Sequence, residues 1–160
     1  MRTKRHDAVV KYVKKRLEGK RMIVHEEPHF ATAGGLRKPD MVVELEDSTL
    51  IIDAQIVSEQ RHLEQANADK VSKYNTEEIK EQVRRRYGKQ QIEVAALTLN
   101  MLGLWSKTSA EQLKKKGLIS SMDIWILSSR VLIRTLACWH CHQASTEMVR
   151  RRRGEGQTSE

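Results

Sequence analysis

The segment between residues 41 and 57 constrains the fold of this chain more than any other stretch. Residues 41–45 and 49–57 are rich in Val, Ile and Leu and are separated by Glu46, Asp47 and Ser48, a pattern typical of an antiparallel β-hairpin. The second run carries large apolar side chains at both odd and even positions. Such a strand is covered on both faces, so it belongs in the interior of a sheet.

The rest of the chain predicts helices and further strands around this hairpin. The expected helices cover residues 6–18, 58–74, 75–88, 108–117 and 123–143, and the expected strands cover residues 21–26 and 92–99. Gly34 and Gly35 predict a loop, Ser58 is expected to cap the second helix, and Asn75 with Glu78 is expected to cap the third. This order predicts an α/β fold, with a mixed central sheet flanked by helices, in the single domain that 160 residues allow.

An aspartate inside the second apolar run indicates a site. Asp53 lies between Ile52 and Ala54, where burying a lone carboxylate costs several kcal/mol unless a partner compensates it. Asp40 lies just before the first run, and a hairpin whose connecting loop has an even number of residues places it directly opposite Asp53. Side chains opposed in this way have Cβ atoms about 4.5–5.5 Å apart. Gln55 follows Asp53 on the same face of the strand.

These side chains predict a divalent metal site. Two close carboxylates repel each other unless a proton or a cation lies between them, and Mg²⁺ is held by one or two carboxylates together with water and phosphate oxygens. Lys70 lies on the apolar side of the helix that follows the Asp53 strand, so it could reach the site, orient the attacking water and neutralise the reacting phosphate. Each residue also has an ordinary alternative: Asp40 could be a turn residue after Pro39, and Lys70 a surface lysine.

The charge distribution favours a polyanionic partner. The net charge is +8, residues 2–21 contain nine Lys or Arg against two acids, and residues 150–153 are all Arg. Clustered cations bind phosphate backbones through counterion release, although such runs are also common on solvated helix faces and tails. An aromatic content of 4% argues against a stacking platform for single strands. No segment reads as a secretory signal or a membrane span, so we expect an intracellular protein with no membrane partner.

Several motifs together resemble a known nuclease family. "KPD" is followed after 12 residues by "DAQ" and then by "KVSKY", and "RHDAVV", "EEP", "DAQIVSEQ", "LEQANADKVSKYN" and "GLWSKTSAEQLKKKGL" occur in the matching order. This combination resembles the PD-(D/E)XK superfamily, and within it the restriction-like endonuclease domain at the C-terminus of site-specific non-long-terminal-repeat retrotransposons that insert into ribosomal RNA genes. The likeness covers most of residues 5–145 and implies a restriction-endonuclease-like fold.

The resemblance implies a role for each matching residue. Asp40 and Asp53 would hold Mg²⁺ or Mn²⁺, Lys70 would be the catalytic lysine, and Tyr74 would support the site. Glu27 is a weaker candidate for a further acidic member, because its acidic neighbour leaves the choice open.

One position departs from the general superfamily pattern. The usual Glu-x-Lys motif reads Asp53-Ala54-Gln55 here, and Gln55 cannot supply a positive charge. The resemblance implies that this charge has moved to Lys70 on the following helix, within a catalytic set that still includes Gln55.

The resemblance also implies the partners and the compartment. Double-stranded DNA would be nicked in the nucleus to prime reverse transcription, and element RNA would be a further partner of a full polyprotein. The expected DNA contacts are Lys11, Lys14, Lys15, Arg37 and Lys38. Alternatives are a catalytically inactive DNA-binding module and a truncated retrotransposon fragment, and the oligomeric state is open.

The two ends of the expected domain carry no further site. The endonuclease domain is expected over residues 5–145, followed by a basic disordered tail over residues 146–160 that could bind DNA or direct nuclear import. Cys138 and Cys141 offer one half of a zinc site, and His25 and His29 would complete it only through tertiary contacts. We expect ordinary core or surface cysteines.

Overall fold

The computed structural model describes residues 2–155, and within this range it describes the side chains of residues 4–150. The described chain contains five helices and six strands. The helices are α1 (Arg2–Gly19), α2 (Leu63–Tyr74), α3 (Glu77–Tyr87), α4 (Lys107–Lys115) and α5 (Ser121–Glu155). The strands are β1 (Ile23–Glu26), β2 (Phe30–Thr32), β3 (Gly35–Arg37), β4 (Met41–Glu44), β5 (Ser48–Val57) and β6 (Gln91–Asn100). This mixed α/β architecture confirms the expected fold class.

The central sheet has the strand order β1-β4-β5-β6. Strand β4 is antiparallel to both of its neighbours, β1 and β5, whereas β5 and β6 run parallel, so the sheet is mixed as predicted. The expected hairpin is confirmed as β4 and β5, and Gln55 is the one residue of β5 that is not fully buried. The expected loop at Gly34 and Gly35 is instead the turn of a small separate hairpin formed by β2 and β3. Its three-residue strands are too short to show a sequence period.

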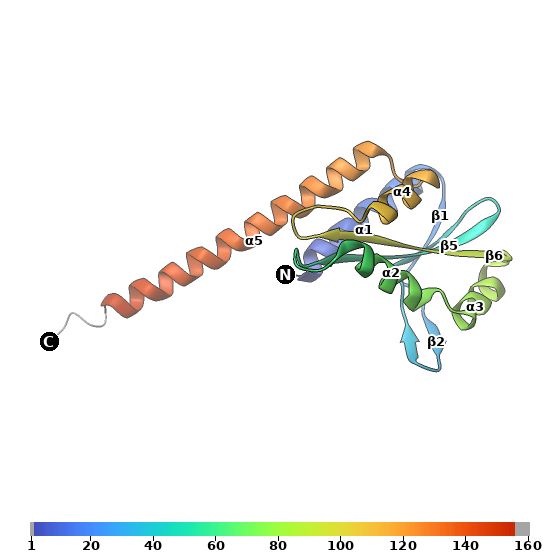
Figure 1. Ribbon diagram of the computed structural model, residues 1–160, viewed down its shortest axis with the longest axis horizontal. Helices are drawn as coiled ribbons and strands as arrows, with labels where there is room; N and C mark the ends of the chain where they lie inside the picture. Colours follow the sequence, from blue (N-terminus) through green and yellow to red (C-terminus); the bar gives the residue numbers. More distant parts are fainter. Residues whose placement is uncertain (1, 156–160) are drawn as a thin grey trace.

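Two apolar clusters lie on the two faces of the sheet. The even-numbered side chains of β5 from Leu50 to Ile56 pack with α1, α4 and the start of α5. Ile51 and the other face of β4 pack with α2, α3 and Phe30 of the small hairpin. The ribbon in Figure 1 follows the same division, with the long strands β5 and β6 between the helices. The two-faced burial predicted for β5 is therefore confirmed.

Two helix starts differ from the sequence prediction. Helix α2 is capped by His62 instead of Ser58, because the chain turns after β5 with the Arg61 N–H donating to the Ser58 carbonyl at 3.1 Å. Helix α3 is capped by Thr76, whose hydroxyl accepts from the N–H of Ile79, and Asn75 instead closes the C-terminus of α2. The predicted end of this helix at residue 88 is confirmed, and Gly88 closes it in the left-handed conformation (φ 78°).

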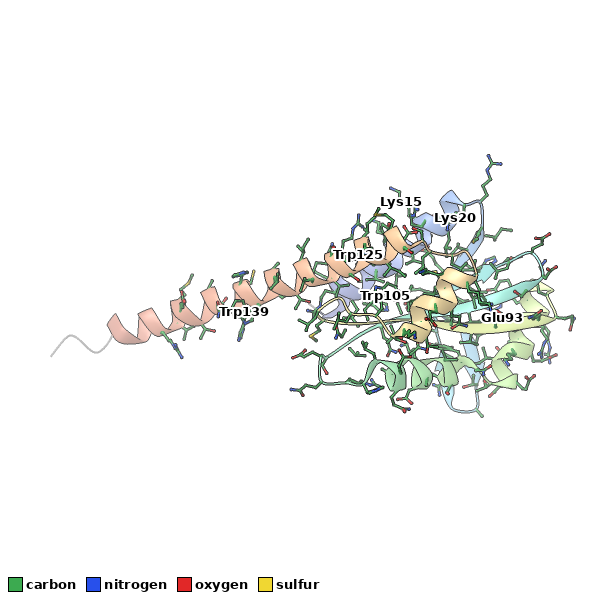
Figure 2. All side chains as sticks on the ribbon, turned by 45° about the horizontal axis from the view of Figure 1, so that its top comes forward. Lys15, Lys20, Glu93, Trp105, Trp125 and Trp139 are labelled. Carbon is green, nitrogen blue, oxygen red and sulfur yellow. The ribbon has the colours of Figure 1, made fainter. Side chains whose placement is uncertain are left out.

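Helix α5 is much longer than expected and extends away from the rest of the molecule (Figure 1). Its start is fixed to α1 by Asp123, which is fully buried, accepts from the Tyr12 hydroxyl at 2.7 Å and pairs with Arg16 at 2.8 Å. Trp125 and Trp139 are 72% and 54% exposed, and Figure 2 shows Trp139 on the extended part of the helix.

The helix also changes the expectation for the C-terminal tail. Residues 146–155 continue α5 as far as Glu155, so this part of the expected disordered tail is helical, and residues 156–160 lie outside the described range. None of the helices in residues 2–155 has the length and apolarity that crossing a membrane requires.

Candidate active site

The hairpin register brings Asp40 beside Asp53. Met41, the first residue of β4, pairs with Ile52 of β5. Asp40 directly precedes Met41 and Asp53 directly follows Ile52, so the two aspartates lie opposite each other. The backbone N–H of Asp40 donates to Asp53 Oδ1 at 3.1 Å, and the N–H of Ala54 donates to Asp40 Oδ2 at 2.7 Å. The predicted juxtaposition of the two carboxylates is confirmed, and it lies where β4 begins on the α2 side of the sheet.

Lys70 of α2 completes this cluster. Its Nζ lies 2.6 Å from Asp53 Oδ2, and the side chains of Lys70 and Asp53 are only 22% and 7% exposed. The ammonium therefore compensates the buried carboxylate that the apolar strand carries. The predicted reach of Lys70 from the helix after β5 is confirmed, and the Asp40–Asp53–Lys70 cluster is the core of the candidate site.

The two carboxyl groups differ in their proton affinity. For Asp53, burial and the neighbouring Asp40 carboxylate outweigh the effect of Lys70 and raise its pKa. For Asp40, burial is outweighed by hydrogen bonds from His6, Asp53 and the Ala54 N–H, which lower its pKa. A close pair of acids with opposite pKa shifts is the expected result of two carboxylates that repel each other in a partly dry site.

His6 belongs to the site, and the sequence prediction missed it. Its Nε2 lies 3.1 Å from Asp40 Oδ2, and this hydrogen bond, opposed by burial, raises the pKa of His6 to about 9. His6 is thus a cation at neutral pH. A signal was available, because His6 precedes Val9 and Val13 on the apolar side of α1 by one and two helical turns.

Gln55 lies beside the cluster but faces α2. Its side-chain amide donates to the Ala66 carbonyl at 2.7 Å and to the Thr98 hydroxyl at 3.0 Å, and that hydroxyl donates to Asn67 at 3.0 Å. Asn67 and Thr98 are almost fully buried. Gln55 therefore orients α2, and with it Lys70, on the sheet. Asn67 and Thr98 were also missed, because hydrogen bonds between distant positions leave no sequence period.

Tyr74 and Glu27 have different relations to the cluster. Tyr74 is 1% exposed, its hydroxyl donates to the Lys38 carbonyl at 3.3 Å, and burial together with Asp53 raises its pKa. It thereby supports the segment that leads into Asp40. Glu27 is exposed and pairs with Lys38 at 3.2 Å, although its backbone N–H donates to the Asp40 carbonyl at 2.9 Å. The structure therefore ties Glu27 to Asp40 through the backbone, while its carboxylate pairs with Lys38.

The donor set suits a hard divalent cation. Two adjacent carboxylates provide oxygen ligands and a local excess of negative charge, and Mg²⁺ uses one or two carboxylates with water and phosphate oxygens completing its shell. Among the described side chains of residues 4–150, no group of three or more His, Cys, Asp or Glu could hold a metal by itself. Asp40 and Asp53 offer two carboxylates only, so an ion bound there would need further oxygen ligands from outside the protein.

The cysteines fall outside this chemistry. Cys138 is half-buried and Cys141 is exposed on α5, both are free thiols, and neither belongs to a metal-binding group in the described chain.

The expected DNA-contacting residues lie on two surfaces. Lys11, Lys14 and Lys15 are on α1, where Lys14 pairs with Glu26 at 2.7 Å. Arg37 and Lys38 lie at the end of β3 and in the segment that leads to Asp40.

The fold and the cluster define an α/β domain with two carboxylates and a lysine beside the central strand of a mixed sheet.

No family model matches the chain. It is 35% identical over 139 residues to the retrovirus-related Pol polyprotein of the type-2 retrotransposable element R2DM of Drosophila melanogaster, which covers 86% of this chain and 13% of that relative. Two Pol polyproteins from type-1 retrotransposable elements R2 are also similar: that of Bradysia coprophila is 36% identical over 84% of this chain and 15% of the relative, and that of Nasonia vitripennis is 30% identical over 95% of this chain and 15% of the relative.

The homologues of this chain are therefore Pol polyproteins of R2 retrotransposons. The chain spans less than one sixth of the length of these relatives. The homology confirms the retrotransposon part of the resemblance seen in the sequence and supports a retrotransposon-related function.

Proposed function

We propose that this chain is a metal-dependent DNA endonuclease domain that hydrolyses a phosphodiester bond of double-stranded DNA. The observation that carries the proposal is the cluster in which Lys70 Nζ lies 2.6 Å from Asp53, beside Asp40. The PD-(D/E)XK-like motifs and the homology to R2 Pol polyproteins support the same activity.

Asp40 and Asp53 would hold Mg²⁺ or Mn²⁺. The ion would supply positive charge at the scissile phosphate and make water a stronger nucleophile. The protein's own contribution is positional: the hydrogen bond from the Ala54 N–H to Asp40 and the one from the Asp40 N–H to Asp53 fix both carboxylates. Two fixed acids lose little conformational freedom when an ion binds.

Lys70 brings a second positive charge to the same place. Phosphoryl transfer places charge on the phosphate oxygens, and a preorganised cation stabilises that charge most effectively in a site with little water. The Gln55 amide holds α2 through the Ala66 carbonyl, which keeps the ammonium near Asp53. His6 neutralises part of the charge on Asp40.

Within a complete element, such a nick in nuclear DNA would prime reverse transcription. Element RNA would then be a further partner, and the polymerase would be supplied by another part of the polyprotein or by a separate protein.

Nicking of supercoiled plasmid tests the activity. We expect wild-type protein to convert plasmid to the open-circular form with Mg²⁺ or Mn²⁺ and to be inactive in EDTA. Asp53→Ala should lower the rate by about 100-fold or more, the size of loss seen when one preorganised group is removed from an active site. Asp47→Ala is the matched control, because it removes an exposed carboxylate at the other end of the same hairpin.

The rival function is an inactive DNA-binding module. Its specific support is Gln55, which occupies the position where the superfamily pattern has lysine. The endonuclease would be refuted if neither wild type nor Asp53→Ala nicks the plasmid while both proteins shift DNA on a gel. That result would favour this rival. Circular dichroism of each variant establishes that it is folded.

A further inference from the structure

Two cavities flank the cluster, and both include His6. The first has a volume of about 500 Å³ and lies between the end of β5 and helix α2. Its charged lining residues are His6, Arg61, Asp69, Lys70 and Lys73. The second has a volume of about 450 Å³ and lies between α1 and the end of β1. Its charged lining residues are His6, Asp7, Lys11, Lys14, Glu26, Glu27 and Asp40.

The two cavities carry opposite charge. Apart from the shared His6, the α2 cavity has three cationic side chains and one carboxylate, whereas the α1 cavity has two cationic side chains and four carboxylates. A phosphate backbone is therefore attracted to one side of the cluster and repelled from the other. The contrast is local, because the chain as a whole has a net charge of +8.

Ion pairing leaves one exposed lysine in each cavity, Lys11 in the α1 cavity and Lys73 in the α2 cavity, with no carboxylate within 4.0 Å in the described part of the chain, so the contrast rests on the charges that line the two cavities. In the α1 cavity, Lys14 is held by Glu26 at 2.7 Å and also lies 3.6 Å from Glu18. In the α2 cavity, Lys73 is exposed and lies 5.1 Å from the ring centroid of Tyr74, and the described part of the chain offers its ammonium no carboxylate within 4.0 Å. Lys73 can thus bind a phosphate without first breaking an ion pair.

We propose that the cavity between β5 and α2 binds the phosphate next to the scissile one, through Arg61 and Lys73, and that the DNA strand leaves the cluster on this side. The inference rests on the proposed function and adds the path of the strand. The preferred ligand is the backbone of duplex DNA, because the cavity lining contains no Phe, Tyr or Trp on which an unpaired base could stack. Asp69, which pairs with Arg61 at 3.1 Å, weakens this attraction.

Salt-dependent binding of a fluorescein-labelled duplex, measured by anisotropy in EDTA, tests the proposal without cleavage. Each lost phosphate contact lowers the slope of log K against log[salt] by about 0.9. We expect the double variant Arg61→Ala/Lys73→Ala to lower the slope by about 1 to 2 and to weaken binding at least about tenfold at low salt. The matched control Lys11→Ala/Lys14→Ala removes the same charge from the other cavity and should change the slope by less than half as much.

One single-charge variant should give an effect of the opposite sign, and a second serves as its control. Asp69→Asn removes the carboxylate of the α2 cavity and should tighten binding about two- to fivefold at low salt, whereas Glu26→Gln should leave it within twofold. Both residues are exposed, so neither change should unfold the protein.

The outcomes separate this proposal from the endonuclease proposal. Equal slopes for the two double variants, or an effect seen with single-stranded RNA but not with the duplex, would overturn the assignment of the cavity even if Asp53→Ala abolishes nicking. An intact slope effect in a protein that never nicks would instead refute the endonuclease and leave the cavity as a DNA-binding surface.

Discussion

The ion pair between Lys70 and Asp53 makes a quantitative prediction about stability. Lys70→Met keeps the length of the side chain and removes its charge, so Asp53, with 7% of its side chain exposed, is left as a buried carboxylate beside Asp40. Breaking a buried ion pair by removing one partner costs about 3–5 kcal/mol. Because Lys70 is 22% exposed, solvent screens part of the interaction, and we expect a loss of about 2 kcal/mol at neutral pH.

The complementary variant Asp53→Asn should lower the free energy of unfolding by less than Lys70→Met does. It removes the repulsion between the two carboxylates, and the partly exposed ammonium of Lys70 keeps access to water, so we expect a change below about 1 kcal/mol. The double variant Asp53→Asn/Lys70→Met leaves no uncompensated charge on either side chain. It should therefore be more stable than Lys70→Met alone, with a coupling energy of about 1–2 kcal/mol.

Urea unfolding followed by circular dichroism in EDTA measures this cycle. With a slope of about 2 kcal/mol per M, the Lys70→Met loss moves the midpoint by about 1 M. Lys73→Met is the control, because it removes an exposed lysine of the same helix and should change stability by at most about 0.5 kcal/mol. A loss below 0.5 kcal/mol for Lys70→Met, or a double variant equal to the sum of the single ones, would show that Lys70 does not compensate Asp53.

Three further predictions concern other parts of the fold. Burial raises the pKa of Asp123, but hydrogen bonds from Ser120, Tyr12 and Arg16 outweigh it and lower the pKa to about 2. Because this value is below the ordinary 3.8, the stabilisation exists above pH 4 and is lost as the pH falls towards 2; Asp123→Asn should cost about 2 kcal/mol at pH 7 and little at pH 2 in urea titrations. Gly103→Ala should cost about 3 kcal/mol in thermal or urea unfolding, because φ is 81° and a Cβ would collide with the Ser128 carbonyl, and a near-neutral result would contradict this backbone. Tyr74→Phe should cost about 1 kcal/mol through the unpaired Lys38 carbonyl and should retain at least about tenfold more nicking than Asp53→Ala; equal activity losses would make Tyr74 part of the chemistry.

The hairpin and its two aspartates could be predicted because strands have an exact period. In a β-strand a side chain's face follows from its number, and a hairpin register relates the two strands by one constant sum. A hairpin over residues 41–57 therefore places Asp40 beside Asp53. The apolar environment of Asp53 then required a partner, and the next helix supplied Lys70.

The helix starts were harder because several neighbouring residues can cap a helix. Asn75 and Thr76 are both good caps, and only the end of α2 decides that Asn75 closes one helix while Thr76 opens the next. Ser58 is a strong cap in isolation, but the chain turns through residues 58–61 before α2 can begin. These choices depend on where the preceding element ends, which local preference does not encode.

The contact between His6 and Asp40 could not be predicted from the sequence pattern. His6 lies 34 positions before Asp40, and its contact exists only because α1 packs across the sheet with Val9 and Val13 buried. The apolar side of α1 already indicated that His6 faces the protein. Which carboxylate it meets depends on the crossing of α1 over the sheet, and this is a property of tertiary packing.

The structural role of Gln55 explains why the lysine of the cluster, Lys70, lies on α2 and not at position 55. Gln55 points towards α2 and uses its amide as a double donor, to the Ala66 carbonyl and to the Thr98 hydroxyl. A lysine there could donate to the same groups only by placing its charge beneath α2, which is costly without a carboxylate partner. Delivered from α2 by Lys70, the charge instead reaches Asp53 at 2.6 Å while 22% of the side chain stays in contact with solvent. Gln55 therefore holds α2 in place with a neutral amide, and α2 in turn carries Lys70 to the site. Gln55→Lys should disturb α2 more than it assists the site.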